Sequence, residues 1–177
     1  GLAFGLALFL PHVTFVDAAV GLVPWLALSV TEAAFVGLFG AGWAWARRGQ
    51  VIWYAARWQV PVFGALWVAL EEARSVVPFG GFPWGRLAFA MADAPLGRWA
   101  WAGGVPAVSF LVAVAGALLG LGLVALRRID LGAGSGYVLL VVALVVSGWL
   151  LPLSSAATDG RLAVGAVQGN VPDRGLD

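Results

Sequence analysis

Charged residues inside an otherwise apolar run are the first features of this sequence that could carry chemistry. Glu71, Glu72 and Arg74 occur within the stretch "WVALEEARSVV", where an unpaired ionised group costs about 2.5–3.5 kcal/mol at the centre of a membrane-spanning helix. On a helix, the spacing of Glu71 and Arg74 puts both on one face, where they can pair. Two interpretations stay open: a structural ion pair near a helix end, or a polar anchor that shapes the next loop or contacts a lipid headgroup.

The loop that follows, "PFGGFPWG" (78–85), combines glycines, prolines and aromatic residues. Irregular backbone at membrane depth persists only where it is buried in protein or lines a cavity. The loop is therefore either a tight interfacial turn with aromatic anchors or a shaped wall beside a lipid-entry site. The residues of this candidate lipid-entry or structural polar site are Glu71, Arg74, Gly81, Phe82, Pro83 and Trp84.

Two further ionisable residues occur in apolar surroundings. Glu32 lies in the middle of a long apolar segment, with Thr31 as its near polar neighbour. A buried partner on another helix, or protonation, would make such a carboxyl tolerable. His12 follows Pro11 at a predicted helix break, which favours a capped or interfacial histidine over a proton relay.

Several chemistries are excluded by what the sequence lacks. It contains no Cys, one His, and ten basic residues that are all Arg, so a thiolate nucleophile and a Cys or His metal cluster are excluded. We expect no metal and no cofactor. The net charge of +1 argues against a nucleic-acid partner, since no basic stripe could neutralise phosphates. Abundant Ala, Gly and Val with Arg in place of Lys is typical of a GC-rich bacterial genome.

The composition indicates a membrane protein. Of the 177 residues, 62% are hydrophobic and 11% charged, and the mean hydropathy is +0.94. A soluble domain of this size could not bury so much apolar surface. A spanning helix needs about 20 mostly apolar residues, and five segments are candidates, the first of them truncated: 2–16, 20–46, 61–77, 104–126 and 136–153.

Other residues mark the predicted edges and contacts of these spans. The segment 51–59 is expected at the membrane interface, and "LGAGSG" (131–136) as a Gly-rich turn. Trp side chains commonly form interfacial belts, and small residues allow close helix packing. The Trp residues expected in such a belt are 43, 45, 53, 58, 99 and 101, and the small residues expected at a helix contact are Ala113, Gly116, Ala117, Gly120 and Gly122.

The arginines predict an orientation. Basic residues concentrate in cytoplasmic loops, which places Arg47, Arg48, Arg57, Arg127 and Arg128 inside. The loop over 78–99 and everything after about residue 154 then lie on the outer face. We therefore expect a multi-pass protein of a bacterial cytoplasmic membrane.

The end of the sequence changes character. Residues 1–153 form the predicted helical domain, and 154–161 a polar linker. "RLAVGAVQGNVP" then alternates as a half-buried strand does, so 162–177 are expected to begin a second domain. A lone strand is not stable, and we expect the natural protein to continue beyond it.

In order and spacing, a set of these residues resembles the membrane portion of bacterial apolipoprotein N-acyltransferases. The set is Trp67, Glu71, Arg74, Gly81, Phe82, Pro83, Trp84, Asp93, Pro95, Leu96, Gly104, Ser109 and Phe110. The closing "VGAVQGNVP" is similar to the first strand of that family's nitrilase-like domain. The sequence departs from the family pattern over 88–91, where Ala88, Ala90 and Met91 replace more polar residues.

The resemblance implies a fold and an activity. The fold would be an all-α integral membrane bundle followed by the start of an α/β nitrilase-like domain. The enzyme would move an acyl chain from a phospholipid to the N-terminal diacylglyceryl-cysteine of an apolipoprotein, through a thioester on a Cys. A Glu base and an oxyanion-binding Lys complete that triad. Because the sequence has no Cys and no Lys, we expect no catalytic residue here and no activity of this segment alone.

Two other functions remain open. The chain could be a non-catalytic membrane anchor or scaffold for a partner enzyme, such as a polyprenol-phosphate mannose synthase. It could also be a transporter subunit, which would need a polar path through the bundle, whereas Glu32 and the Glu71–Arg74 group are the intramembrane charges that the sequence offers.

Overall fold

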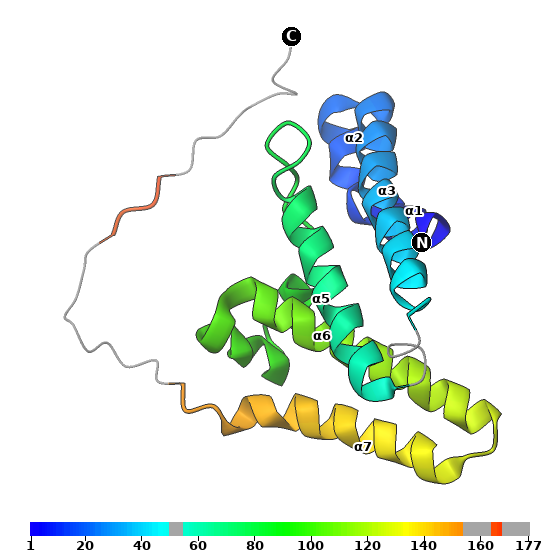
Figure 1. Cartoon of the computed structure of the whole chain (residues 1–177). Coiled ribbons are helices and arrows are strands. Elements are labelled where there is room, and N and C mark those ends of the chain that lie inside the picture. Colours follow the sequence, from blue (N-terminus) through cyan, green and yellow to red (C-terminus); the bar gives the residue numbers. More distant parts are fainter. Residues whose placement is uncertain (50–54, 154–163, 168–177) are drawn as a thin grey trace.

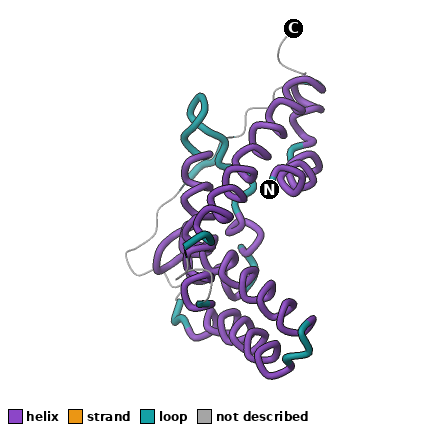
Figure 2. Tube along the Cα trace, turned by 45° about the vertical axis from the view of Figure 1, so that its right-hand side comes forward, coloured by secondary structure: helices purple, strands orange, loops and turns teal. Residues whose placement is uncertain are grey.

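The computed structural model describes residues 1–49, 55–153 and 164–167. These residues form helices and loops, and none of them forms a strand (Figure 2). The predicted strand over 162–172 lies mostly outside the described residues, and 164–167 have no regular secondary structure. The helical membrane domain is thus described, while the start of a nitrilase-like domain stays a prediction.

The first predicted span is two short helices. α1 (Leu2–His12) and α2 (Thr14–Val20) meet at Val13 and are bent by 55° to one another. Pro11 lies inside α1, so the break follows it rather than coinciding with it. Gly21, at a φ of 94°, ends α2, and this left-handed conformation is one that glycine adopts readily.

α3 (Leu22–Ala46) runs antiparallel to this pair and packs on it (Figure 1). The two segments approach closely because Gly5 has no side chain: a Cβ there would lie 2.7 Å from the Cα of Ala33. Phe9, Val13 and Val36 form the buried cluster between them.

α5 (Ala56–Arg74) rises beside α3 toward the loop over 75–86 (Figure 1). It begins and ends earlier than the predicted span of 61–77. The predicted interfacial segment 51–59 is partly described, with Trp58 exposed near the start of this helix.

Two 3-10 turns, η1 (Leu87–Met91) and η2 (Pro95–Trp99), lead into α6 (Ala100–Arg127). α6 is kinked at Gly103 and Gly104, where Gly104 has a φ of 65°, and Pro106 adds to the break. α7 (Leu131–Ser147) lies side by side with α6 in Figures 1 and 2 and ends in a third turn, η3 (Gly148–Leu150).

The predicted Gly-rich turn over 131–136 is wrong. These residues are the first turns of α7, because the Asp130 carboxylate accepts a hydrogen bond from the Ala133 N–H at 3.0 Å and caps the helix. Such a cap satisfies one of the free N–H groups at a helix start. Gly122 and Gly134 lie at the α6–α7 contact, so the prediction of close packing is right for Gly122. It is wrong for Gly116 and Gly120, which face open space.

The number of spans differs from the five predicted. Among the described residues, three stretches are long and apolar enough to cross a membrane, or four when the bent α1–α2 pair counts as one. They are Leu22–Ala46, Pro95–Arg127 and Leu131–Leu150, with Leu2–Val20 as the pair. α5 falls short because it carries Arg57, Glu71, Glu72 and Arg74. Large apolar side chains are exposed along α3, α6 and α7, as lipid-facing helices require.

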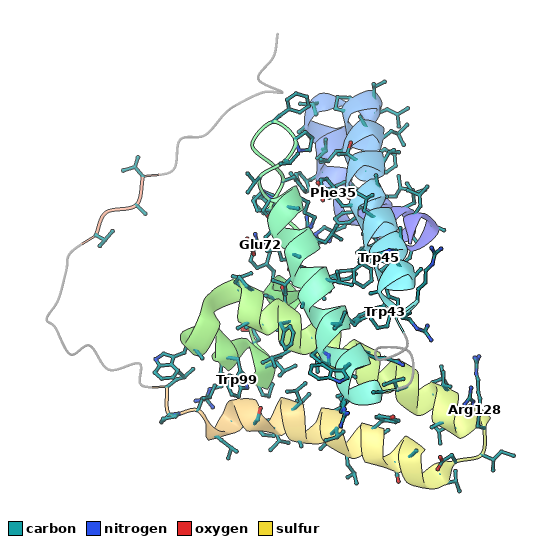
Figure 3. The ribbon with its side chains drawn as sticks, viewed as in Figure 1. Phe35, Trp43, Trp45, Glu72, Trp99 and Arg128 are labelled. Atoms are coloured by element: carbon teal, nitrogen blue, oxygen red, sulfur yellow. The ribbon has the colours of Figure 1, made fainter. Side chains whose placement is uncertain are left out.

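The aromatic side chains divide into two groups. Trp45, Trp58 and Trp101 are exposed, as an interfacial belt predicts, whereas Trp43 stacks edge-on against Phe63 with ring centroids 5.2 Å apart. Figure 3 shows Trp99 beside α7, where its indole N–H donates to the Ser147 hydroxyl at 3.0 Å. In the same view Arg128 lies at the turn between α6 and α7, and Glu72 near the upper end of α5.

Candidate functional site

Arg74 is the last residue of α5 and joins three parts of the chain. Its Nη1 donates to Glu32 Oε2 at 2.9 Å and to the carbonyl oxygens of Phe82 at 3.0 Å and Trp84 at 2.7 Å. Arg74 is 3% exposed and Glu32 1% exposed. A buried charge needs a partner and further hydrogen bonds, and Arg74 has both.

These contacts correct one sequence prediction and confirm another. The predicted pairing of Glu71 with Arg74 is wrong, because the guanidinium of Arg74 points to α3 and to the loop instead. The buried partner on another helix that Glu32 required is Arg74. Of the two alternatives for Glu32, the paired one is therefore realised.

Glu71 fixes the start of η1. Its Oε1 accepts from the Trp67 Nε1–H and from the Leu87 backbone N–H, both at 2.9 Å. Trp67 lies one turn earlier on α5, so the helix itself aligns indole and carboxylate. Glu71 is 2% exposed, and its Oε2 has no protein partner among the described residues.

The loop is closed by backbone hydrogen bonds around Gly81. The Phe82 N–H donates to the Arg74 carbonyl at 2.8 Å, and the Gly81 N–H to the Pro78 carbonyl at 2.8 Å. Gly81 has a φ of 78°, and a Cβ there would overlap the backbone of Ser75 and Val76. Only glycine fits this position, for both reasons.

Pro83 and Trp84 face outward although their backbone is held. The Phe82 side chain packs on the buried Phe9 cluster, whereas Trp84 is 60% exposed and its ring lies 6.2 Å from that of Phe15. Pro83, Trp84 and Phe89 line a shallow pocket of about 320 Å³. We refer to Glu32, Glu71, Arg74 and residues 82–84 together as the polar junction.

A second, outer layer of polar contacts surrounds the polar junction. Arg86 donates to both carboxylate oxygens of Glu72, at 2.6 and 3.2 Å, and to the Ser75 hydroxyl at 2.6 Å. The Ser75 hydroxyl in turn donates to the Glu71 carbonyl at 2.6 Å. The Glu72 side chain is 48% exposed, so this layer faces the surroundings, whereas the charged residues of the polar junction, Glu32, Glu71 and Arg74, are buried.

The segment that departs from the family pattern makes its polar contact through the backbone. The Ala88 N–H donates to the hydroxyl of Ser109, a fully buried residue of α6, at 3.2 Å. Together with the Leu87 N–H on Glu71, this bond docks η1 between α5 and α6. The residues at 88–91 therefore hold η1 in place without polar side chains of their own.

An open apolar groove of about 580 Å³ adjoins the polar junction. It lies among α1, α3, α5 and α6, and its lining includes Val36, Phe39, Phe63, Trp67, Leu87 and Gly116. Trp67 and Leu87 are the residues whose N–H groups donate to Glu71. The polar junction therefore lies behind this part of the lining, and none of its own residues lines the groove. We call it the lateral groove.

Among residues 1–49, 55–153 and 164–167, no three His, Asp or Glu side chains come together as a metal site would require. His12 is exposed in the last turn of α1, with its ring edge-on to Phe9 at 6.3 Å.

Three connections of this site were not predicted from the sequence. Two are the ion pairs of Glu32 with Arg74 and of Glu72 with Arg86. Their partners are far apart in sequence, so no helical spacing indicates that they pair. The Trp67–Glu71 bond had a signal, since an indole and a carboxylate four residues apart on a helix lie within reach of each other.

Comparisons with known proteins agree with the resemblance. The family model described as the apolipoprotein N-acyltransferase N-terminal domain matches residues 1–118. A curated protein of Mycolicibacterium smegmatis named apolipoprotein N-acyltransferase is 39% identical over the whole chain, which spans 31% of that relative's length. No solved structure matches. The chain belongs to the apolipoprotein N-acyltransferase family, whose N-terminal domain it contains.

Proposed function

We propose that this chain is the membrane part of an enzyme that transfers an acyl chain from a phospholipid to the N-terminal diacylglyceryl-cysteine of lipoproteins. The family and the name of the Mycolicibacterium smegmatis relative support an acyltransferase of lipoproteins. The phospholipid donor, the apolipoprotein acceptor and the bilayer are then the partners of the complete protein.

The lateral groove is the observation that carries this proposal. Its volume of about 580 Å³ lies in the range of small-molecule sites, about 300–1,000 Å³. Its lining is almost wholly apolar, and it is open to one side. In a bilayer, acyl chains are the apolar molecules that reach such a groove, so it provides a lateral approach for the donor chain.

The polar junction lies where the headgroup end of that chain would be. Glu71 borders the lateral groove through Trp67 and Leu87, and Arg74 holds the carbonyls of Phe82 and Trp84. We infer that Glu71, Arg74 and the loop from Gly81 to Trp84 form the wall of a lipid-entry site. The exposed Trp84 ring suits this place, because indoles favour the headgroup level of a bilayer.

The reaction itself belongs to residues outside this chain. By the family resemblance, the nucleophilic Cys, the Glu base and the Lys would follow in the nitrilase-like domain that 162–177 begin. The arginine distribution favours a bacterial cytoplasmic membrane with that domain on the outer face. α3 ends and α5 begins at the end of their pair opposite the loop over 75–86 (Figure 1), which accords with this orientation.

The lateral groove can be blocked without disturbing the backbone. Gly116 lines it, and a Cβ at Gly116 would meet nothing within 4 Å. We expect Gly116→Leu in the complete protein to lower the rate of acyl transfer about tenfold or more. The leucine side chain would occupy the volume of several methylene groups in the groove, and a single methylene in an apolar pocket already changes rates by about tenfold or more. The measurement is the rate of transfer from a phospholipid to a diacylglyceryl-peptide.

Gly120 provides the matched control. It lies one turn later on α6, also has open space at its Cβ, and is not part of the lining of the lateral groove. Gly120→Leu should transfer acyl chains at the unsubstituted rate. Equal rates for both variants would refute lateral access by this route. A complete protein that transfers no acyl chain would instead favour the alternative of a non-catalytic anchor for a partner such as a polyprenol-phosphate mannose synthase.

A further inference from the structure

Glu32 has a place in the structure that the candidate site of the sequence analysis did not include. It is the eleventh residue of the 25-residue helix α3, which puts it about 15 Å along the helix axis from Leu22. It is 1% exposed and pairs with Arg74, 42 residues later in the sequence. An ionised carboxylate in the middle of a membrane-spanning helix costs free energy, and such residues commonly mark functional sites.

The single nitrogen Nη1 of Arg74 links Glu32 to the loop. It is 2.9 Å from Glu32 Oε2, 3.0 Å from the Phe82 carbonyl oxygen and 2.7 Å from the Trp84 carbonyl oxygen. Because the guanidinium is a rigid plane, a carboxylate that fixes this nitrogen also fixes where the two carbonyls can be held. Glu32 therefore acts on the loop through Arg74.

The contact of Arg74 with the Phe9 ring does not fix the orientation of the guanidinium, whereas its hydrogen bond to Glu32 does. The Phe9 ring lies 5.5 Å from the Arg74 Cζ, a contact that favours a cation over the ring face but fixes no single hydrogen bond. Directional contacts are worth most where water is excluded. Without the Glu32 charge, the guanidinium keeps the Phe82 and Trp84 carbonyls as acceptors but loses the hydrogen bond that fixes it, and with it the loop, relative to α3.

We propose that Glu32 is a positioning residue for acyl transfer: it orients Arg74, and Arg74 holds the Phe82 and Trp84 carbonyls so that the loop keeps its place beside the lateral groove. The predicted effect of Glu32 on acyl transfer rests on the proposed function. The predicted effect of Glu32 on the order of the loop is independent of that function.

A purely structural ion pair between α3 and α5 is the competing explanation. Replacing a buried pair by apolar residues of similar size is often neutral for stability. The double variant Glu32→Leu/Arg74→Leu should therefore fold in either case. The double variant lacks the two carbonyl contacts in either case. A structural pair predicts that its loop stays ordered and that transfer is normal, whereas positioning predicts a folded protein with a loosened loop and slower transfer.

The experiment uses the complete protein in lipid nanodiscs and two readouts. Hydrogen exchange of the peptide covering 78–88 measures the order of the loop, since the N–H groups of Gly81, Phe82 and Leu87 donate hydrogen bonds to Pro78, Arg74 and Glu71. Steady-state kinetics give kcat and KM for the phospholipid. The variants are Glu32→Gln, Glu32→Asp, the double variant, and Ser29→Ala as control.

Ser29 is a matched control because it is fully buried on α3, one turn before Glu32, and its hydroxyl has no partner among the described residues. Ser29→Ala should leave both readouts unchanged. Glu32→Gln should raise exchange in 78–88 about tenfold, with α6 and α7 unaffected. It should lower kcat/KM about ten- to a hundredfold, as expected for a loop displaced by about 1 Å. Glu32→Asp, which keeps the charge, should fall between the two.

Two results would overturn the inference. One is unchanged exchange over 78–88 in a folded Glu32→Gln variant. The other, which decides the matter if Glu32→Gln does not fold, is a double variant that matches the unsubstituted protein in both readouts. If the unsubstituted complete protein transfers no acyl chain, the proposed function fails, and loop exchange alone still decides the role of Glu32.

Discussion

The polar junction and the α6–α7 hairpin are two regions of one helical domain that are held together by different means. In the polar junction, a buried ion pair and backbone carbonyls meet at Arg74. In the hairpin, Gly122 and Gly134 let α6 and α7 approach, and Asp130 caps the turn. Hydrogen bonds in an apolar setting are directional, whereas packing of small residues sets closeness alone. The loop is thus held in one position by directional contacts, whereas the hairpin is held at one distance by packing.

Removing Arg74 should have the largest effect on stability. Arg74→Ala leaves the Glu32 carboxylate buried without its partner, which lowers the free energy of unfolding by about 3–5 kcal/mol. Thermal unfolding in detergent measures it. Arg86→Ala is the control, because its partner Glu72 is half-exposed and such pairs contribute about 0–1 kcal/mol. Equal losses for the two arginines would erase the distinction between the inner and outer polar layers.

An intermediate effect is expected at Gly81. Gly81→Ala combines left-handed backbone strain with overlap on the Ser75 backbone, together about 2–4 kcal/mol. The neighbouring Gly80 has a φ of 94° but open space at its Cβ, so Gly80→Ala should lose only the strain of about 1–2 kcal/mol. Chemical denaturation of both variants compares them. If Gly81→Ala were no less stable than Gly80→Ala, the loop would be able to shift at little cost in free energy, and its position would not be fixed.

The smallest effect belongs to the hairpin. Asp130→Ala removes the cap on the Ala133 N–H and should lower the free energy of unfolding by about 1 kcal/mol. Asp130→Asn should retain nearly all the stability, because Asn caps as well as Asp does. Circular dichroism during thermal unfolding follows both variants. If the Asn variant lost as much as the Ala variant, the charge at Asp130 rather than its hydrogen bond would matter in the hairpin.

The sequence predicted the apolar helices better than their ends and contacts. The bodies of α3 and α6 follow from long apolar runs, interrupted in α3 by the single charged residue Glu32 and in α6 by none before Arg127, and runs of this length are typical of spanning helices. The start of α7 was missed because "LGAGSG" has the residues of a turn, although glycine is common in membrane helices and Asp130 caps this one. α5, predicted as a span, carries more charged residues than the three long apolar helices do, and two of them, Glu71 and Arg74, belong to the polar junction.

The residues of the candidate site lie close together in the structure, but the predicted pairing between two of them, Glu71 and Arg74, is wrong. Gly81 and Phe82 were singled out from their residue types, and the structure places both in contact with the end of α5. The partner of Arg74 could not be found in this way, because Glu71 at three residues' distance looked closer than Glu32. Helix periodicity finds neighbours on one helix; pairing across helices depends on how the helices pack.

Lipid photo-crosslinking tests the central claim, lateral access of an acyl chain beside the polar junction, most directly. A phospholipid with a photoreactive group on its acyl chain would be added to the complete protein in nanodiscs, and the labelled residues mapped by mass spectrometry. We expect labels concentrated on the lateral groove, at Phe39, Phe63 and Trp67, and their loss in Gly116→Leu. Labels spread evenly over the exposed face of α7, with no excess in the lateral groove and no change in Gly116→Leu, would contradict it.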